Sequence, residues 1–168
     1  LSLYQFDGVV EKVYSGDLKN FGTYQLLPRG STALYDAIGI AINEVGLELS
    51  SMREEDRPGL VLVAIVTDGY ENASKEYNSE TNQRMINEQK TKYSWKFEFM
   101  CCDENTLNTG KALGFNSATK YNVSKTGNVY SHMSAKFSNV RSLSANCASN
   151  VALEAAMNYT DDQKKDMV

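Results

Sequence analysis

Two short segments carry oxygen side chains of the kind that hold a hard divalent cation. Gly30–Thr32 opens a helical pattern, and Thr67–Gly69 ends a strongly apolar run. Thr32 offers a hydroxyl beside the free N–H groups of a helix start, and Asp68 offers a carboxylate at a strand end. Such ligands suit Mg²⁺, Mn²⁺ or Ca²⁺ better than zinc. Because α/β proteins bind ligands at the carboxyl edge of a parallel sheet, we expect both residues at that edge.

Each of these residues also has a plain structural interpretation. Thr32 is equally well explained as a helix-capping residue, and Asp68 as a turn former. Three further polar residues, Asp7, Glu71 and Asn72, are candidates for the rim of the same site, with Ser31 beside them. The alternatives are an Asp-Gly turn for Asp7, a solvated loop for Glu71 and Asn72, and a helix N-cap for Ser31.

The elements that position these residues begin with a hairpin. Residues 1–6 and 9–14 read as antiparallel strands around an Asp-Gly turn. Apolar residues then recur at steps of three and four over residues 34–49, which predicts a helix behind Ser31. Residues 60–66 are apolar without alternation, which predicts a central parallel strand covered on both faces.

Helix and strand patterns alternate over the rest of the chain. The expected elements are a helix over 79–92, a strand over 95–101, a helix over 105–113, a strand over 118–123 and a helix over 126–141. The alternation predicts a Rossmann-like α/β fold, a mostly parallel sheet with helices on both faces and one antiparallel edge strand. We expect one domain over residues 1–141. Residues 142–168 would form an extension, partly helical or disordered, whose charged end over 161–166 frays.

Composition excludes several classes of function. The chain has 168 residues and a formal net charge of −4, which argues against a nucleic-acid partner. The absence of a long apolar run or signal sequence predicts a cytoplasmic protein with no membrane partner. Cys101, Cys102 and Cys147 lack C-x-x-C spacing and are expected to be free thiols in a reducing compartment. The single histidine, His132, argues against histidine triads and multi-histidine zinc sites.

The string Arg29–Ile38, followed by Val66–Asn72, resembles the von Willebrand factor A (VWA) domain, especially its small bacterial and phage versions. The resemblance covers residues 1–141 with the same order of elements. In that family a metal-ion-dependent adhesion site (MIDAS) combines an Asp-x-Ser-x-Ser loop, a threonine and an aspartate. The resemblance assigns the threonine to Thr32 and the aspartate to Asp68. It implies Mg²⁺, or Mn²⁺ or Ca²⁺, as the bound ion, and a protein partner that contributes an acidic side chain.

The chain departs from the family pattern at one point, because none of its 168 residues forms an Asp-x-Ser-x-Ser loop. The family's first strand and helix, about 30 residues of a βαβ unit, therefore have no counterpart. That strand is central in the family's sheet, so its loss would leave two strand edges unpaired. We favour a truncated piece of a longer protein. The alternatives are that the two edges close on each other, or that a homodimer compensates for the missing strand.

The function expected from these observations is a non-enzymatic protein-interaction module of the VWA type with an incomplete metal site. A hard cation takes six or more oxygen ligands, so Thr32 and Asp68 alone would bind it weakly. One alternative is a structural VWA-like fold with a vestigial site. Another, a metal-dependent phosphoesterase, is disfavoured because the sequence has no second carboxylate beside Asp68, no Asp-x-Asp, no glycine-rich phosphate loop and no nucleophile–base pair.

Overall fold

The computed structural model describes residues 1–27 and 29–168, and these form two compact units. The first unit consists of residues 1–57 and 70–85, and the second of residues 58–69 and 86–168. Within the described residues, none of the helices has the length and apolar character that a membrane span requires.

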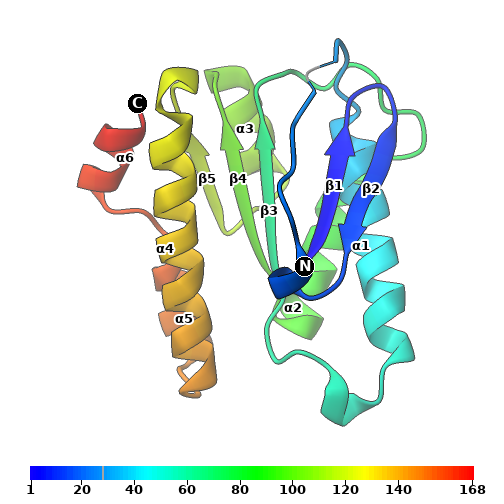
Figure 1. The fold of residues 1–168 in the computed structure, drawn as a ribbon, viewed down its shortest axis with the longest axis vertical. Helices are drawn as coiled ribbons and strands as arrows, with labels where there is room; N and C mark the ends of the chain where they lie inside the picture. Colours follow the sequence, from blue (N-terminus) through cyan, green and yellow to red (C-terminus); the bar gives the residue numbers. More distant parts are fainter. Residues whose placement is uncertain (28) are drawn as a thin grey trace. The chain divides into compact units, whose positions relative to one another are not determined.

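The first unit combines a hairpin with a long helix (Figure 1). Strands β1 (Ser2–Phe6) and β2 (Val10–Ser15) pair antiparallel around the Asp-Gly turn, as predicted. A short 3₁₀ helix, η1 (Leu18–Asn20), follows the hairpin. Helix α1 (Leu34–Ser51) buries one face of its N-terminal half, and a second 3₁₀ helix, η2 (Glu54–Asp56), comes after it. The predicted helix is therefore confirmed, with its stripe as the buried face.

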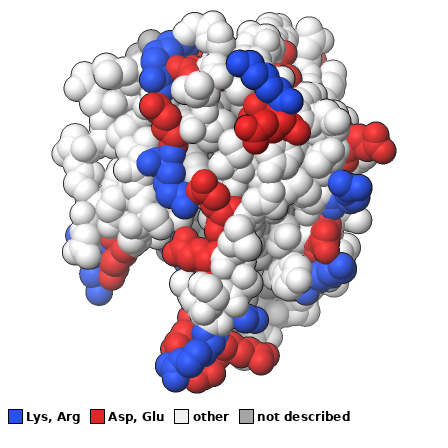
Figure 2. Space-filling view, turned by 90° about the vertical axis from the view of Figure 1, so that its right-hand side faces the viewer, with Lys and Arg blue, Asp and Glu red and all other residues white. Residues whose placement is uncertain are grey.

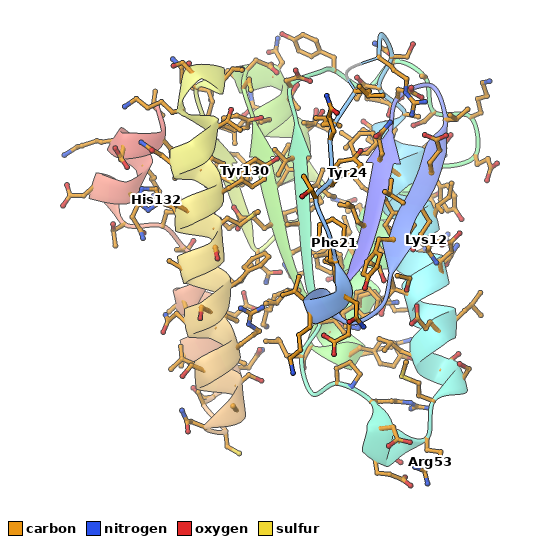
Figure 3. The ribbon with its side chains drawn as sticks, in the orientation of Figure 1. Lys12, Phe21, Tyr24, Arg53, Tyr130 and His132 are labelled. Carbon is orange, nitrogen blue, oxygen red and sulfur yellow. The ribbon has the colours of Figure 1, made fainter. Side chains whose placement is uncertain are left out.

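Helix α1 is joined to the hairpin by polar contacts as well as apolar ones. Tyr4 on β1 donates a hydrogen bond to Glu44 on α1 over 2.9 Å, and Lys12 on β2 forms an ion pair with the same carboxylate over 2.6 Å. Lys12 is labelled on the hairpin in Figure 3. The extended residues after η1 contact the hairpin too, since Tyr24 donates to Gln5. These contacts hold α1 against one face of the β1–β2 pair.

The second unit contains a parallel sheet in the order β3-β4-β5 (Figure 1). Its strands are β3 (Leu62–Thr67), β4 (Lys96–Cys101) and β5 (Ser117–Lys120). The prediction that the apolar run over 60–66 is the central strand is wrong. β4 is central and all six of its residues are buried, whereas β3 lies at the edge and exposes Ala64. The prediction of a single mixed sheet is also corrected, because the described strands form two sheets, one of two strands and one of three.

The faces of β4 are covered by different helices of the second unit. On one face lies α3 (Glu104–Ala112), and a Cβ on Gly110 would collide with the ring of Phe99. Only glycine therefore permits this close approach of helix to strand. The other face carries α4 (Thr126–Ala145), α5 (Asn150–Ala156) and α6 (Asp161–Met167), and α2 (Ser79–Tyr93) precedes β4 in the chain.

Residues 142–168 contribute to the core of the second unit. Leu153 and Met157 pack with Val140 of α4 in one buried cluster. Met167, at the end of α6, is fully buried in another. A capping box from Thr160 starts α6, so the prediction that residues 161–166 fray is wrong. Capping and a single buried methionine keep this charged segment helical.

Candidate functional site

Thr32 lies two residues before the first residue of α1. It is therefore near the N-terminal end of this helix, where the sequence predicted a ligand site. Ala33, the N-cap, makes no side-chain cap of its own. Its N–H instead donates to the carbonyl oxygen of Asp7 over 2.6 Å, which ties the helix start to the hairpin turn. The prediction that Ser31 caps the helix is therefore wrong. Ser31 is exposed, and its Cβ lies near Gly8 of the hairpin turn.

The loop over residues 70–78 caps α1 instead of Ser31. The N–H of Thr32 donates to the side-chain oxygen of Asn72 over 2.9 Å, and the N–H of Asn72 donates back to the carbonyl of Thr32 over 3.0 Å. Glu71 accepts from the N–H of Tyr35 over 2.9 Å. A carboxylate at this position also meets the positive end of the helix dipole. The loop thus satisfies N–H groups that would otherwise be free to hold an anion.

Glu71 is fully engaged within the first unit. Its two carboxylate oxygens accept from the N–H groups of Ala73 and Ser74, and from the hydroxyl of Ser74 over 2.7 Å. Burial alone would raise the pKa of this carboxyl. The hydrogen bonds from Ser74, Tyr35 and Ala73 outweigh it and lower the pKa below the usual range. Glu71 is therefore an ionised capping group, and its oxygens already have donors.

Asp36, in the first turn of α1, binds backbone N–H groups of the same loop that caps the helix. It is buried, and its carboxylate accepts from the N–H groups of Lys75, Glu76 and Tyr77 over 2.8 to 3.0 Å. Burial raises its pKa, but these three hydrogen bonds overcome that effect and the net shift is downward. The Tyr77 ring lies so close to α1 that a Cβ on Gly39 would collide with it. We call Asp36, Glu71 and Asn72, with the backbone they bind, the α1 clamp.

Asp7 is also occupied, as a turn residue and an ion-pair partner. One carboxylate oxygen accepts from the N–H of Val9 over 2.8 Å, and the other pairs with Arg29. Arg29 pairs with Glu11 of β2 as well. The sequence placed Asp7 among the rim candidates; the contacts show a buried aspartate whose oxygens stabilise the hairpin turn and hold Arg29.

Asp68 lies in the second unit, directly after β3, and is exposed. The residues that flank Asp68 are hydrogen-bonded to each other, since the N–H of Gly69 donates to the hydroxyl of Thr67 over 3.3 Å. This bond makes the end of the strand a turn. Because Thr32 belongs to the first unit, the expected pairing of Thr32 with Asp68 stays a prediction. Among residues 1–27 and 29–168, no three His, Cys, Asp or Glu side chains are grouped so that they could hold a metal.

A cavity of about 360 Å³ lies at the carboxyl ends of β4 and β5 in the second unit. It is lined by Cys102, Lys120, Tyr121, Asn122, Val123 and Val168. Burial raises the pKa of the Cys102 thiol, so the thiolate that a nucleophile requires is disfavoured. Lys120 lies 3.5 Å from Glu104 in an ion pair. The Cys102 thiol therefore lacks the lowered pKa that is typical of a reactive cysteine.

Sequence reasoning missed a set of charged residues on the face of β4 that α4 and α5 cover. Lys96 is completely buried and donates to Glu154 over 2.7 Å and to Asn150 over 2.6 Å, both on α5. Asn116 donates to the other oxygen of Glu154 over 2.6 Å. Charged and aromatic residues alternate along this strand, so the period of two could have placed Lys96 and Glu98 on one face.

Glu98 and Lys136 form a second, more deeply buried pair on the same face. The Lys136 ammonium also lies 3.4 Å from the centre of the Tyr159 ring and donates to the carbonyl of Met157 over 3.1 Å. Burial raises the pKa of Glu98 and lowers that of Lys136, each partly offset by the other's charge. Lys136 lies on the apolar stripe of α4, four residues before Val140. Its position on this stripe was the signal from which its burial could have been predicted.

On the face shown in Figure 2, acidic and basic side chains are interspersed. Comparisons with protein-family models, curated protein sequences and solved structures found no match. What the described residues define is therefore an α/β protein with a parallel three-stranded sheet and a separate antiparallel hairpin.

Proposed function

We propose that this chain is a non-enzymatic protein-interaction module of the VWA type in which the metal site is incomplete. The observation that carries the proposal is the order of elements: a hairpin, a long helix that begins two residues after Thr32, and a parallel strand that Asp68 directly follows. Two further parallel strands, each preceded by a helix, complete the order that the resemblance implies.

The donor set around Thr32 does not fit a resident cation. Glu71 and Asn72, the nearest side-chain oxygens bound to the helix start, accept hydrogen bonds from the backbone. That leaves the Thr32 hydroxyl and the Asp68 carboxylate, whereas a hard cation takes six or more oxygens. In this proposal a protein partner is held mainly by surface contacts, and a divalent ion contributes little unless further ligands are supplied.

The α1 clamp favours a second candidate, a structural VWA-like fold whose site is vestigial. Its carboxylates accept backbone hydrogen bonds and hold a loop to a helix, which is a purely structural task. The two candidates differ in whether Thr32 and Asp68 have any role in recognition. Neither requires catalysis, and both predict weak cation binding.

Calorimetric titration with Mg²⁺ and with Mn²⁺ tests the incomplete site. We expect dissociation constants in the millimolar range or weaker for the wild-type chain, and the same for Asp68→Ala. The matched control is Glu48→Ala, which removes an exposed carboxylate from α1. Micromolar binding that Asp68→Ala abolishes and Glu48→Ala leaves intact would overturn the proposal. Turnover of a generic phosphoester, lost in Asp68→Ala, would favour the phosphoesterase instead.

A further inference from the structure

Three side chains of complementary chemistry meet inside the second unit, at Lys96 of β4. Lys96 is completely buried, and its ammonium lies 2.6 Å from the side-chain oxygen of Asn150 and 2.7 Å from a carboxylate oxygen of Glu154. An amine, a carboxamide and a carboxylate are the groups that an amide crosslink between two side chains requires. The amine is the nucleophile, the carboxamide carbon is attacked, and the carboxylate moves the protons. All three residues belong to the second unit, so their arrangement does not involve the first.

Helix α5 presents the two acceptors to Lys96 from one of its faces. Asn150 and Glu154 are four residues apart, and residues at this spacing are neighbours on a helix surface. The start of α5 is fixed by Ser149, whose side chain caps the helix, and Leu153 packs in a buried cluster with α4. The three groups are therefore held together by ordered elements, which raises the effective concentration of each toward the others.

Asn150 is the member of this set whose carbonyl carbon is open to attack. Burial would raise the pKa of Glu154, but hydrogen bonds from Lys96 and Asn116 lower it overall, so Glu154 is a carboxylate without a leaving group. Asn116 accepts from the N–H of Phe97 over 2.7 Å and donates to Glu154 over 2.6 Å, which holds the carboxylate in place. Asn150 is exposed, so ammonia released from it has a path to solvent.

We propose that Lys96 and Asn150 form an intramolecular amide bond, with Glu154 as the proton carrier. Glu154 takes a proton from the Lys96 ammonium, and the free amine attacks Cγ of Asn150. The Nζ–Cγ bond forms, the Cγ–Nδ2 bond breaks, and Glu154 passes a proton to the departing nitrogen. The products are a secondary amide and one ammonium ion, and Glu154 is again a carboxylate. No oxidant, reductant or cofactor is consumed.

The resting ion pair sets the rate of this step. Lys96 and Glu154 pair as an ammonium and a carboxylate, and an ammonium is not a nucleophile. The bond therefore forms slowly after folding, and faster as rising pH increases the share of free amine. It joins the central strand of the sheet to α5 and closes a covalent loop between residues 96 and 150 that persists when the chain unfolds. The bond does not depend on the proposed VWA function or on a metal.

The mass of the intact chain tests the bond. After incubation at mildly alkaline pH, the wild-type chain should be lighter than its sequence by one ammonia, and Asn150→Ala should keep its full mass. Glu154→Ala should slow the loss by about 100-fold or more. Asn108→Ala removes an exposed asparagine of α3 and is the matched control, which should lose ammonia like the wild type. Trp95 fluorescence verifies that each variant is folded. A wild-type chain that keeps its full mass would refute the proposal, as would ammonia loss that continues in Asn150→Ala.

Peptide mapping locates the bond. Trypsin does not cleave after a lysine whose side chain is amidated, so residues 93–111 should remain joined to residues 142–164. A succinimide at an asparagine also releases ammonia, but it leaves cleavage after Lys96 unchanged and joins no peptides. Recovery of a separate peptide over residues 97–111 from the chain that has lost ammonia would rule out the crosslink at Lys96.

Discussion

The α1 clamp of the first unit and the β4 ion pairs of the second use carboxylates in opposite ways. In the clamp, Asp36 and Glu71 accept mainly from backbone N–H groups that the helix and loop already hold in place. On β4, Glu98 is buried and accepts from the flexible side chain of Lys136. Backbone donors require little ordering, whereas two buried charges lose the hydration of both. The clamp is therefore a stabilising device, and the buried pair is costly unless it stays complete.

The pKa values express the same difference. The hydrogen bonds of the clamp lower the pKa of Asp36 and Glu71 below the usual carboxyl range, despite burial. On β4, burial outweighs the Lys136 charge and raises the pKa of Glu98. A lowered pKa means that the folded state favours the ionised form, and a raised pKa means the reverse. The predictions below test this contrast, starting with the largest expected effect.

Removing one partner of the buried pair should have the largest effect. Lys136→Met leaves Glu98 buried without its cation and should lower the free energy of unfolding by about 3 to 5 kcal/mol. The double variant Lys136→Met, Glu98→Leu should recover most of that loss, because neither charge remains. Urea unfolding can be followed by the fluorescence of Trp95, the single tryptophan, which is buried in the second unit. Equal loss in the single and double variants would contradict a cost from the unpaired charge.

Neutralising the clamp should have an intermediate effect. Asp36→Asn keeps one acceptor oxygen for three N–H groups and should cost about 1.5 to 3 kcal/mol, the range for hydrogen bonds to charged groups. Amide hydrogen exchange at positions 35 and 36 and at residues 75–77 should accelerate, while the unfolding reported by Trp95 fluorescence changes less. Glu76→Gln, at an exposed side chain of the same loop, is the control and should leave exchange unchanged.

Acid should weaken the clamp. Because the folded-state pKa of Glu71 is lowered, its stabilisation is present above the unfolded-state pKa and is lost as the pH falls through the folded-state pKa. Glu71→Gln should therefore be less stable than the wild type at neutral pH, by about 1 kcal/mol as for a lost cap. The gap should close below about pH 4. Unfolding curves across this range measure the gap, and a constant gap would show that ionisation of Glu71 is irrelevant.

The same argument gives the opposite sign for Glu98. Its folded-state pKa is raised, so its contribution to stability falls as the pH rises from the unfolded-state pKa toward the folded-state value. The stability that Glu98→Gln loses relative to wild type should accordingly shrink across that interval, whereas the loss in Glu71→Gln grows with pH. Trp95 fluorescence reports this unit directly. A gap that changes in the same direction for both variants would remove the contrast between the two regions.

The smallest effect is expected at the surface. Arg53 pairs with Glu55 and Asp56, but all three side chains are more than half exposed. Arg53→Ala should change the free energy of unfolding by less than about 0.5 kcal/mol, and less still at high salt. Urea unfolding at low and high ionic strength provides the measurement. A loss comparable to that of Asp36→Asn would mean that exposure does not separate these ion pairs from the clamp.

Much of the local structure could be predicted from the sequence. The hairpin around Asp7, the helix stripe starting at Leu34 and the stripe of α4 all follow from periodicities that a single element imposes on its own residues. The position of Asp68 at a strand end was equally local. Strand order was not, because β3 is the more apolar strand while β4, which carries Lys96 and Glu98, is central, and only the pairing of the strands decides this.

The sequence by itself determined the alternation of elements, and hence an α/β fold with Thr32 before a helix and Asp68 after a strand. Only the tertiary structure decided what the polar residues do there. Glu71, Asn72 and Asp7 were site candidates by type, but the backbone that folds beside them takes up their oxygens. The physical reason is that a side chain's hydrogen-bond partners, and therefore its pKa and its availability to a ligand, come from segments distant in the chain.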